Sequence, residues 1–207
     1  MLEIPQRLKK EMFDLINKRL ISELEEAVYP GEIATKFNSI LNDEFKNYSL
    51  YPVFVGEYGI DPNSPQKTRV VSHQGTKACS PLKIIEGIIG RAIRTGKDQY
   101  VPDVTKDPDH VGCDPTMEGS ELVLLSWSEP SIYGNKKIPS IPLGVLDIDL
   151  NIKNALTKYD RQRLRAIWDI YGKFIFPGKL RFEAPERVYN PLPYKRNICK
   201  NREALKR

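Results

Sequence analysis

The residues best suited to chemistry lie between Asp109 and Glu121, where the chain reads DHVGCDPTMEGSE. This stretch contains a histidine, His110, a cysteine, Cys113, and a Ser120-Glu121 pair. A thiolate is a strong nucleophile, and a nearby histidine or carboxyl group can poise it or transfer protons. The stretch therefore predicts a site in which the cysteine reacts.

Two apolar strands are expected to hold this stretch in place. The first is predicted from Glu121 to Ser126, and the second from Leu143 to Ile148, within the sequence PLGVLDID. Asp147 and Asp149 alternate with apolar residues at the end of the second strand, as in a strand with two different faces. A thiol, a histidine and three acids are thus expected at strand ends or on a loop between strands.

Further strands and a helix complete the predicted sheet domain. Residues 50–58 and 67–75 are expected to form a hairpin, and residues 99–101 a short strand. Between them, residues 86–95 have helical periodicity and end at Gly96. The pattern favours an α+β fold, an antiparallel sheet with helices stacked on one side.

Two amphipathic helices are predicted before this domain and one at its end. The apolar stripe of the first comprises Leu8, Met12, Leu15, Ile16, Leu20, Leu24 and Val28. That of the second comprises Ile33, Phe37, Ile40, Leu41 and Phe45. The last helix begins at Thr157 and has an apolar face of Leu164, Ile167, Trp168, Tyr171 and Phe174. We divide the chain into a helical segment (residues 1–48), the sheet domain (49–177) and an irregular basic tail (178–207).

Composition narrows the class of protein. The chain has 207 residues, of which 40% are hydrophobic and 29% charged, as in ordinary globular proteins. It contains no apolar run long enough to span a membrane, and its N-terminus lacks the features of a signal peptide. Three cysteines are too few and odd in number for a secreted disulfide scaffold, so we expect a cytoplasmic protein. The net charge of +5 is concentrated in the tail, which makes nucleic acid an unlikely partner.

The order of several short motifs resembles the GAF domain. They are GIIGRAIRTGK, YVPDV, DHVGCD, SELV and GVLDID, and the likeness covers about residues 50–176. More narrowly, the chain resembles the single-domain GAF enzymes that reduce free methionine-(R)-sulfoxide. The resemblance implies a GAF fold and a small-molecule substrate.

The resemblance also assigns roles to individual residues. It implies that Cys113 is the catalytic cysteine and that Cys79 forms a disulfide with it during turnover. The acids that it assigns to catalysis are Glu121, Asp147 and Asp149. The residues that we assign to substrate binding are Phe54, Tyr58, His110, Asp114 and Ser120.

The chain departs from the family pattern near this site. Ile89 stands where many members have a third cysteine, which we expect to affect recycling. Phe54 replaces a tryptophan, Glu57 replaces an aromatic residue, and the loop from Cys113 to Glu121 is one residue longer. We expect these three differences to change the shape of the pocket.

Sulfoxide reduction explains why these residue types would be needed. A thiolate attacks the sulfur, an acid protonates the departing oxygen, and the resulting sulfenic acid condenses with a second thiol. Clustered acids can also hold the ammonium group of the substrate. No bound cofactor or metal is expected. The expected partners are the substrate, an external thioredoxin-like dithiol reductant and, through the helices, a second copy in a homodimer, but no membrane.

Alternatives of other classes remain open. A non-catalytic GAF module would bind a small ligand and act through a protein partner. A zinc site from His110, Cys113 and Cys79 would lack a fourth suitable ligand nearby. A nucleic-acid-associated regulator would use the basic tail. His110 has an equally good interpretation as an ordinary loop residue, and either aspartate as a turn cap.

Overall fold

The computed structural model describes residues 5–24, 27, 29–50, 52–113, 118–133 and 135–176. The tail predicted for residues 178–207, with Cys199, lies outside these ranges, and so does Asp114.

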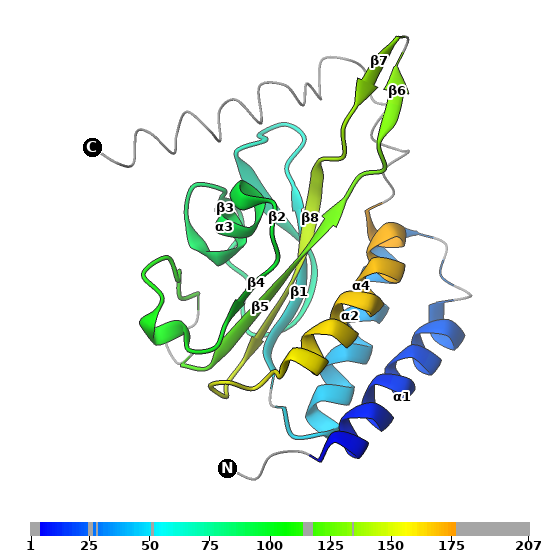
Figure 1. The fold of residues 1–207 in the computed structure, drawn as a ribbon, viewed down its shortest axis with the longest axis vertical. Helices are drawn as coiled ribbons and strands as arrows, with labels where there is room; N and C mark the ends of the chain where they lie inside the picture. The colour runs from blue at the N-terminus through cyan, green and yellow to red at the C-terminus, as the bar shows by residue number, and fades with distance from the viewer. Residues whose placement is uncertain are drawn as a thin grey trace.

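A six-stranded antiparallel sheet forms the centre of the molecule (Figure 1). Its strands, in spatial order, are β3 (Leu82–Lys83), β2 (Lys67–Gly75), β1 (Pro52–Ile60), β8 (Pro142–Leu150), β5 (Ser120–Trp127) and β4 (Gln99–Val101). β6 (Ser131–Tyr133) and β7 (Lys136–Ile138) form a separate hairpin, which projects beyond the end of the sheet. The predicted strands at residues 67–75 and 99–101 are confirmed, whereas β3 was not anticipated.

Helices cover both faces of the sheet. α1 (Gln6–Leu24), α2 (Pro30–Asn47) and α4 (Lys158–Ile175) pack on one face, and α3 (Gly87–Thr95) lies on the other. The expectation of helices on one side only is therefore wrong for α3. Two apolar clusters result, because side chains alternate between the faces of each strand. Leu122 and Leu124 of β5 face the three helices, while Val123 and Leu125 face α3.

The first two helices belong to the same core as the sheet. Phe13 and Ile16 of α1 and Phe37 of α2 are fully buried, in one cluster with Ile148 of β8 and Trp168 of α4. Lys9 of α1 also donates a hydrogen bond of 2.7 Å to the buried carboxylate of Asp160 in α4. The helices α1 and α2 are therefore one layer of the domain that they precede.

The ends of the helices agree with their sequence signals. Thr157 caps α4, since its hydroxyl accepts from the backbone N–H of Asp160, whose carboxylate accepts from the N–H of Thr157. Gly96 ends α3 in the left-handed conformation, at φ 64°. Two predicted core residues are exposed: Leu15 is 38% accessible and Phe174 is 54% accessible, because each lies at the solvent edge of its helix.

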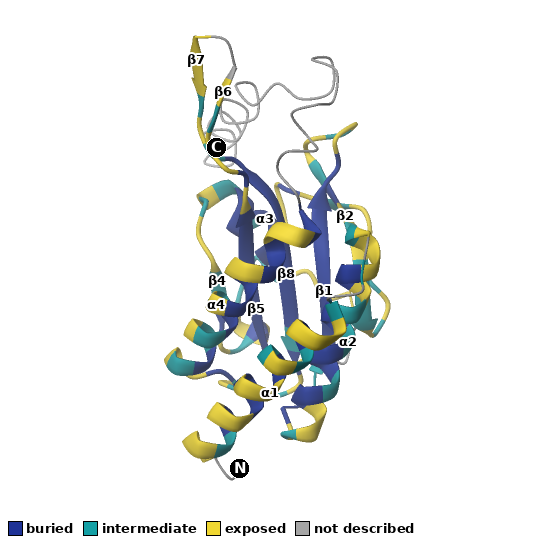
Figure 2. Cartoon of the chain, turned by 90° about the vertical axis from the view of Figure 1, so that its right-hand side faces the viewer, coloured by how far each residue is buried: buried dark blue, intermediate teal, exposed yellow. Residues whose placement is uncertain are grey.

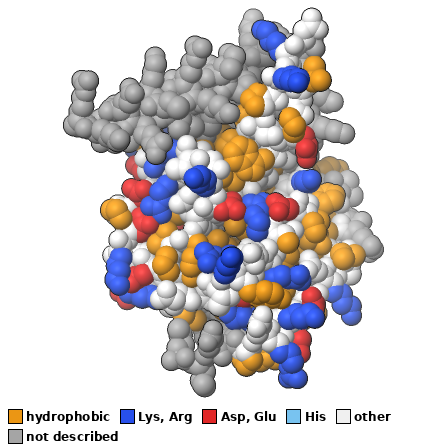
Figure 3. Space-filling model, in the orientation of Figure 1, with side chains coloured by type: hydrophobic (Ala, Val, Ile, Leu, Met, Phe, Trp, Pro, Cys, Tyr) orange, Lys and Arg blue, Asp and Glu red, His pale blue; other side chains and the backbone are white. Residues whose placement is uncertain are grey.

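Exposed residues lie on the outer surfaces of the helices, and the central strands β1, β5 and β8 are buried through most of their length (Figure 2). On the face that carries α4, charged side chains of both signs are interspersed (Figure 3). Arg165, for example, pairs with Asp98 and Asp169. None of the helices in the described part of the chain is long and apolar enough to cross a membrane.

A buried polar pair lies in the helix-covered face. Glu57 of β1 accepts a hydrogen bond from the amide of Asn38 in α2, and both residues are fully buried. Burial raises the pKa of Glu57 well above its usual value, although the Asn38 hydrogen bond acts in the opposite direction. Glu57 thus faces away from α3, and the expectation that it shapes the substrate pocket directly is wrong.

Glu57→Gln should make the free energy of unfolding less dependent on pH. Glu57 ionises near pH 4.3 in the unfolded chain but holds its proton to a higher pH when folded, so wild-type stability falls as pH rises through this window. The variant lacks this contribution. Its free energy of unfolding, relative to that of the wild type, should therefore rise by about 1 kcal/mol or more between pH 5.5 and pH 8. Urea denaturation at pH 5.5 and at pH 8 measures the free energy of unfolding of both proteins. Glu129→Gln, at a carboxylate that is 77% exposed, is the control; equal pH slopes for Glu57→Gln and wild type would contradict the account.

Candidate active site

Three carboxyl groups converge on the α3 face of the sheet. Glu121 of β5 is paired directly with Asp149 of β8, and Asp147 lies two residues before it on the same face. One oxygen of each group lies within 4.8 Å of an oxygen of the others. Register alone brings these acids together, because the interleaved residues Leu122 and Ile148 point to the opposite face.

The environment of these acids favours their protonated forms. Burial is the largest cause that raises the pKa of Glu121 and of Asp147 well above the usual range, and repulsion from neighbouring acids adds to it. Burial raises the pKa of Asp149 to about 7. One oxygen of Asp147 and one of Asp149 are buried without a hydrogen-bond partner among the described residues. A donor or a cation placed here would therefore satisfy atoms that are otherwise left unpaired.

Aromatic side chains of β1 form one wall beside the acids. Phe54 pairs with Asp149 across the β1–β8 ladder, and its ring lies 6.0 Å from that of Tyr58. Phe54 also stacks on His73 of β2, with ring centroids 5.4 Å apart. Gly56 makes this possible, because a Cβ there would lie 2.6 Å from the Phe54 ring and 2.8 Å from His73 Cβ. The stack between Phe54 and His73 was not anticipated from the sequence.

Both cysteines open onto the same cavity. Cys79, in the loop after β2, and Cys113 are joined by a disulfide, with their Cα atoms 5.6 Å apart. The cavity beneath them has a volume of about 50 Å³. Its lining includes, besides the two cysteines, Phe54, Tyr58, His110, Glu121, Asp147 and Asp149, together with Gly87, Ile88 and Ile89 at the start of α3. Eight of the ten residues assigned to the site from the sequence thus meet in one place.

Of the remaining two assigned residues, the structure describes only Ser120, which does not line the cavity. The prediction that Ser120 binds the substrate is wrong. Ser120 lies on the opposite face from Glu121, where its hydroxyl donates a 2.8 Å hydrogen bond to the carbonyl of Ile152. Its role is to anchor the start of β5. Asp114 lies outside the described residues.

The loop that carries Cys113 is held by an arginine that sequence reasoning missed. The guanidinium of Arg91, in α3, donates two parallel hydrogen bonds of 2.7 and 2.8 Å to the carboxylate of Asp107 and one of 3.2 Å to Asp109. Its Nε donates to Gln99 of β4. Asp107 in turn accepts from the backbone N–H of Asp109 and of His110. Arg91 therefore fixes the loop, which follows the short helix η1 (Val104–Lys106), to the wall of the cavity.

His110 lines the cavity and is half-buried, and desolvation lowers its pKa. A neutral imidazole can accept a proton from a thiol. His110 is therefore compatible with both interpretations, as a group that poises the thiol and as an ordinary loop residue.

The ligand atoms present suit an ammonium group or a hard cation better than they suit zinc. Among the described residues, Glu121, Asp147 and Asp149 are the only group of three or more potential ligands close enough to share an ion. Their oxygens are hard donors, which bind an ammonium group or a hard cation. His110, Cys79 and Cys113 do not form such a group, and the two sulfur atoms are bonded to each other.

Comparison with known proteins identifies the fold. A solved GAF domain superposes with a TM-score of 0.67 at 24% identity, over 80% of this chain and 88% of its own. The chain has the GAF fold. No family model matches the sequence.

The chain is similar to several curated proteins. GAF domain-containing protein A of Dictyostelium discoideum is 28% identical over 170 residues, which cover 80% of this chain and 94% of that protein. The free methionine-R-sulfoxide reductase of Saccharomyces cerevisiae is 28% identical over 137 residues, 66% of this chain and 70% of its own. This GAF-fold protein therefore resembles the free methionine-R-sulfoxide reductases, as its motifs predicted.

Arg91→Ala should slow closure of the Cys79–Cys113 disulfide by about tenfold or more, because the loop loses its bidentate anchor. Arg91→Lys should recover only part of the rate, since lysine keeps the charge but not the planar fork. The rate is measured on the reduced protein after a pulse of peroxide, by trapping free thiols over time.

Arg165→Ala is the matched control for this prediction. Arg165 is 26% exposed, against 23% for Arg91, and it also pairs with two aspartates, but on the α4 side of the sheet. Its variant should close the disulfide at the wild-type rate. If Arg91→Ala also closes at that rate, the loop does not depend on the anchor.

Proposed function

We propose that this protein reduces free L-methionine-(R)-sulfoxide, or a close small-molecule sulfoxide, with Cys113 as nucleophile and Cys79 as resolving thiol. The observation that carries the proposal is that a bonded cysteine pair, two buried acids and one partly buried acid line one small cavity. The similarity to the yeast reductase supports the choice of substrate.

The residues of the cavity suffice for the reaction. The thiolate of Cys113 attacks the sulfoxide sulfur, and a protonated carboxyl group of the cluster gives its proton to the oxygen. The S–O bond breaks as the oxygen passes to Cys113, so that methionine leaves and a sulfenic acid remains. The thiol of Cys79 then displaces water from the sulfenic acid and forms the disulfide. The raised pKa values of Glu121, Asp147 and Asp149 keep a proton available near neutral pH.

The same cavity offers a partner for each end of an amino acid. The acid cluster can hold the ammonium group, which compensates its buried negative charge. The first turn of α3 lines the cavity through Gly87, Ile88 and Ile89, and the side chain of its N-cap residue, Glu86, makes no capping hydrogen bond. The first N–H groups of the helix are suited to the carboxylate. Phe54 and Tyr58 provide an aromatic wall for the methylthio part of the substrate.

In this proposal the disulfide form stands at the end of the reaction. The cavity of about 50 Å³ beneath the bond has room for a few water molecules. Reduction would release Cys113 from Cys79 and restore both thiols before the next substrate binds. Since Ile89 lines the cavity where many reductases have a third cysteine, Cys79 is the only described thiol within reach for the resolving step.

The alternative function is a non-catalytic GAF module that binds a cationic small molecule at the same acids. Such a module would bind a ligand without consuming it and would not need either thiol.

The decisive assay follows methionine formation from free L-methionine-(R)-sulfoxide with dithiothreitol as reductant. Wild type should turn over the (R) isomer and leave the (S) isomer unchanged. Cys113→Ser should lower the rate at least a thousandfold, because the nucleophile is lost. Cys79→Ser should retain a single turnover, since its Cys113 still attacks, but should recycle more slowly.

The two cysteine variants also separate the alternatives. Turnover that survives in Cys113→Ser would contradict the mechanism. Absence of turnover in a folded, fully reduced wild type would leave the binding module as the better explanation.

A further inference from the structure

Regeneration of the site requires an external thiol to reach the disulfide. Cys113 is exposed and Cys79 is half-buried, so the bond lies at the surface end of the cavity. Two aliphatic side chains in segments that adjoin this cavity lie outside the core. Ile85 and Val111 are each 42% accessible.

These two side chains belong to the rim of the cavity. Val111 precedes Cys113 by two residues and itself lines the cavity. Ile85 immediately precedes Glu86 and Gly87, which line the same cavity. The two segments are in contact, because a Cβ built on Gly87 would lie 3.6 Å from Val111 Cγ2.

The rim is also held firmly in place. Ile84, next to Ile85, is 4% accessible and packs in the α3-side core. The carbonyl of Ile84 accepts a hydrogen bond from Arg94 of α3. In the second segment, Arg91 anchors Asp107 and Asp109, just before Val111. The exposed aliphatic pair is therefore presented by two fixed segments next to a reducible bond.

We propose that Ile85 and Val111 form the docking surface for a protein dithiol that reduces the Cys79–Cys113 disulfide. The partner is a protein whose paired thiols lie in an apolar face, because such a face would bury both aliphatic side chains as its thiolate approaches the sulfur. The inference rests on the proposed function to the extent that each turnover leaves this disulfide to be reduced.

The exchange is balanced without any further reactant. One thiolate of the partner attacks a sulfur of the Cys79–Cys113 bond, which forms a mixed disulfide and releases the other cysteine as a thiolate. The second thiol of the partner then displaces the remaining cysteine. Both cysteines of this protein are reduced, and the partner leaves with its own disulfide.

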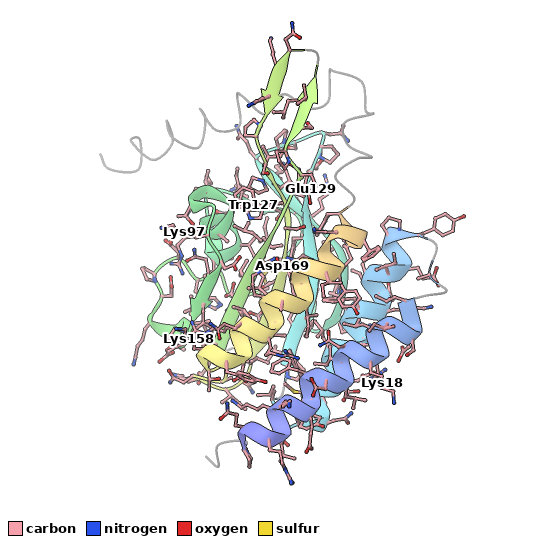
Figure 4. All side chains as sticks on the ribbon, turned by 45° about the vertical axis from the view of Figure 1, so that its right-hand side comes forward. Lys18, Lys97, Trp127, Glu129, Lys158 and Asp169 are labelled. Carbon is pink, nitrogen blue, oxygen red and sulfur yellow. A yellow bond between two sulfur atoms is a disulfide. The ribbon has the colours of Figure 1, made fainter. Side chains whose placement is uncertain are left out.

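The test measures reduction of the disulfide itself, in the absence of any sulfoxide. Disulfide-bonded protein is mixed with reduced thioredoxin or with dithiothreitol, and released thiols are trapped with an alkylating mass tag at timed intervals. Ile85→Glu places a charge on the docking surface at a residue that does not line the cavity. Ile170→Glu is the matched control, at an isoleucine that is 55% accessible on α4, across the sheet. Figure 4 labels its neighbour Asp169 on that helix.

We expect Ile85→Glu to lower the second-order rate constant with thioredoxin by about fivefold to tenfold. Its rate with dithiothreitol should stay within about twofold of wild type, because a small dithiol needs no docking surface. Ile170→Glu should match wild type with both reductants.

Three results would overturn the inference: an unchanged thioredoxin rate in Ile85→Glu, an equal loss with both reductants, or a wild-type rate with thioredoxin no greater than with dithiothreitol. Because the assay contains no sulfoxide, each result leaves the proposed substrate to be judged by its own assay.

Discussion

The candidate site depends on three carboxyl groups, two buried and one partly buried, that two neighbouring strands hold near their ends. Like charges whose oxygens lie within 4.8 Å of one another cannot all be ionised in a place with little water. The cluster therefore retains protons to higher pH than carboxyl groups in water, or else acquires a compensating cation. A site with these properties can donate a proton and bind an ammonium group, which are two of the demands of sulfoxide reduction on an amino acid.

One face of the sheet packs against the supporting helices, and the other face carries the candidate site. α1, α2 and α4 cover one face with a large apolar core, which holds β1, β5 and β8 in register. The other face receives the acids, the aromatic wall and the cysteines, under the single helix α3. Arg91 links that helix to the loop of Cys113. A rigid sheet thus positions the acids, while the nucleophile lies on a loop with a defined anchor.

The sequence predicts much of this arrangement because short-range signals carry it. Alternation along β8 is enough to place Asp147 and Asp149 on one face, and the capping residue Thr157 is enough to begin α4. The same alternation turns Glu57 and Ser120, the neighbours of Tyr58 and Glu121, to the other face. Features that depend on pairing between distant segments could not be found in this way. In the sequence Arg91 looks like an ordinary helical residue, because only the fold brings Asp107 beside it.

The most direct test of the central claim is the exchange of protons when the substrate binds. Reduced Cys113→Ser protein, which should bind L-methionine-(R)-sulfoxide without consuming it, is titrated by calorimetry near pH 7 in buffers of different ionisation enthalpy. An ammonium group beside Glu121, Asp147 and Asp149 should lower their raised pKa values, so binding should release protons to the buffer. Release that disappears well below pH 5 would agree with the account. Binding without proton release, or no binding by the folded protein, would contradict it.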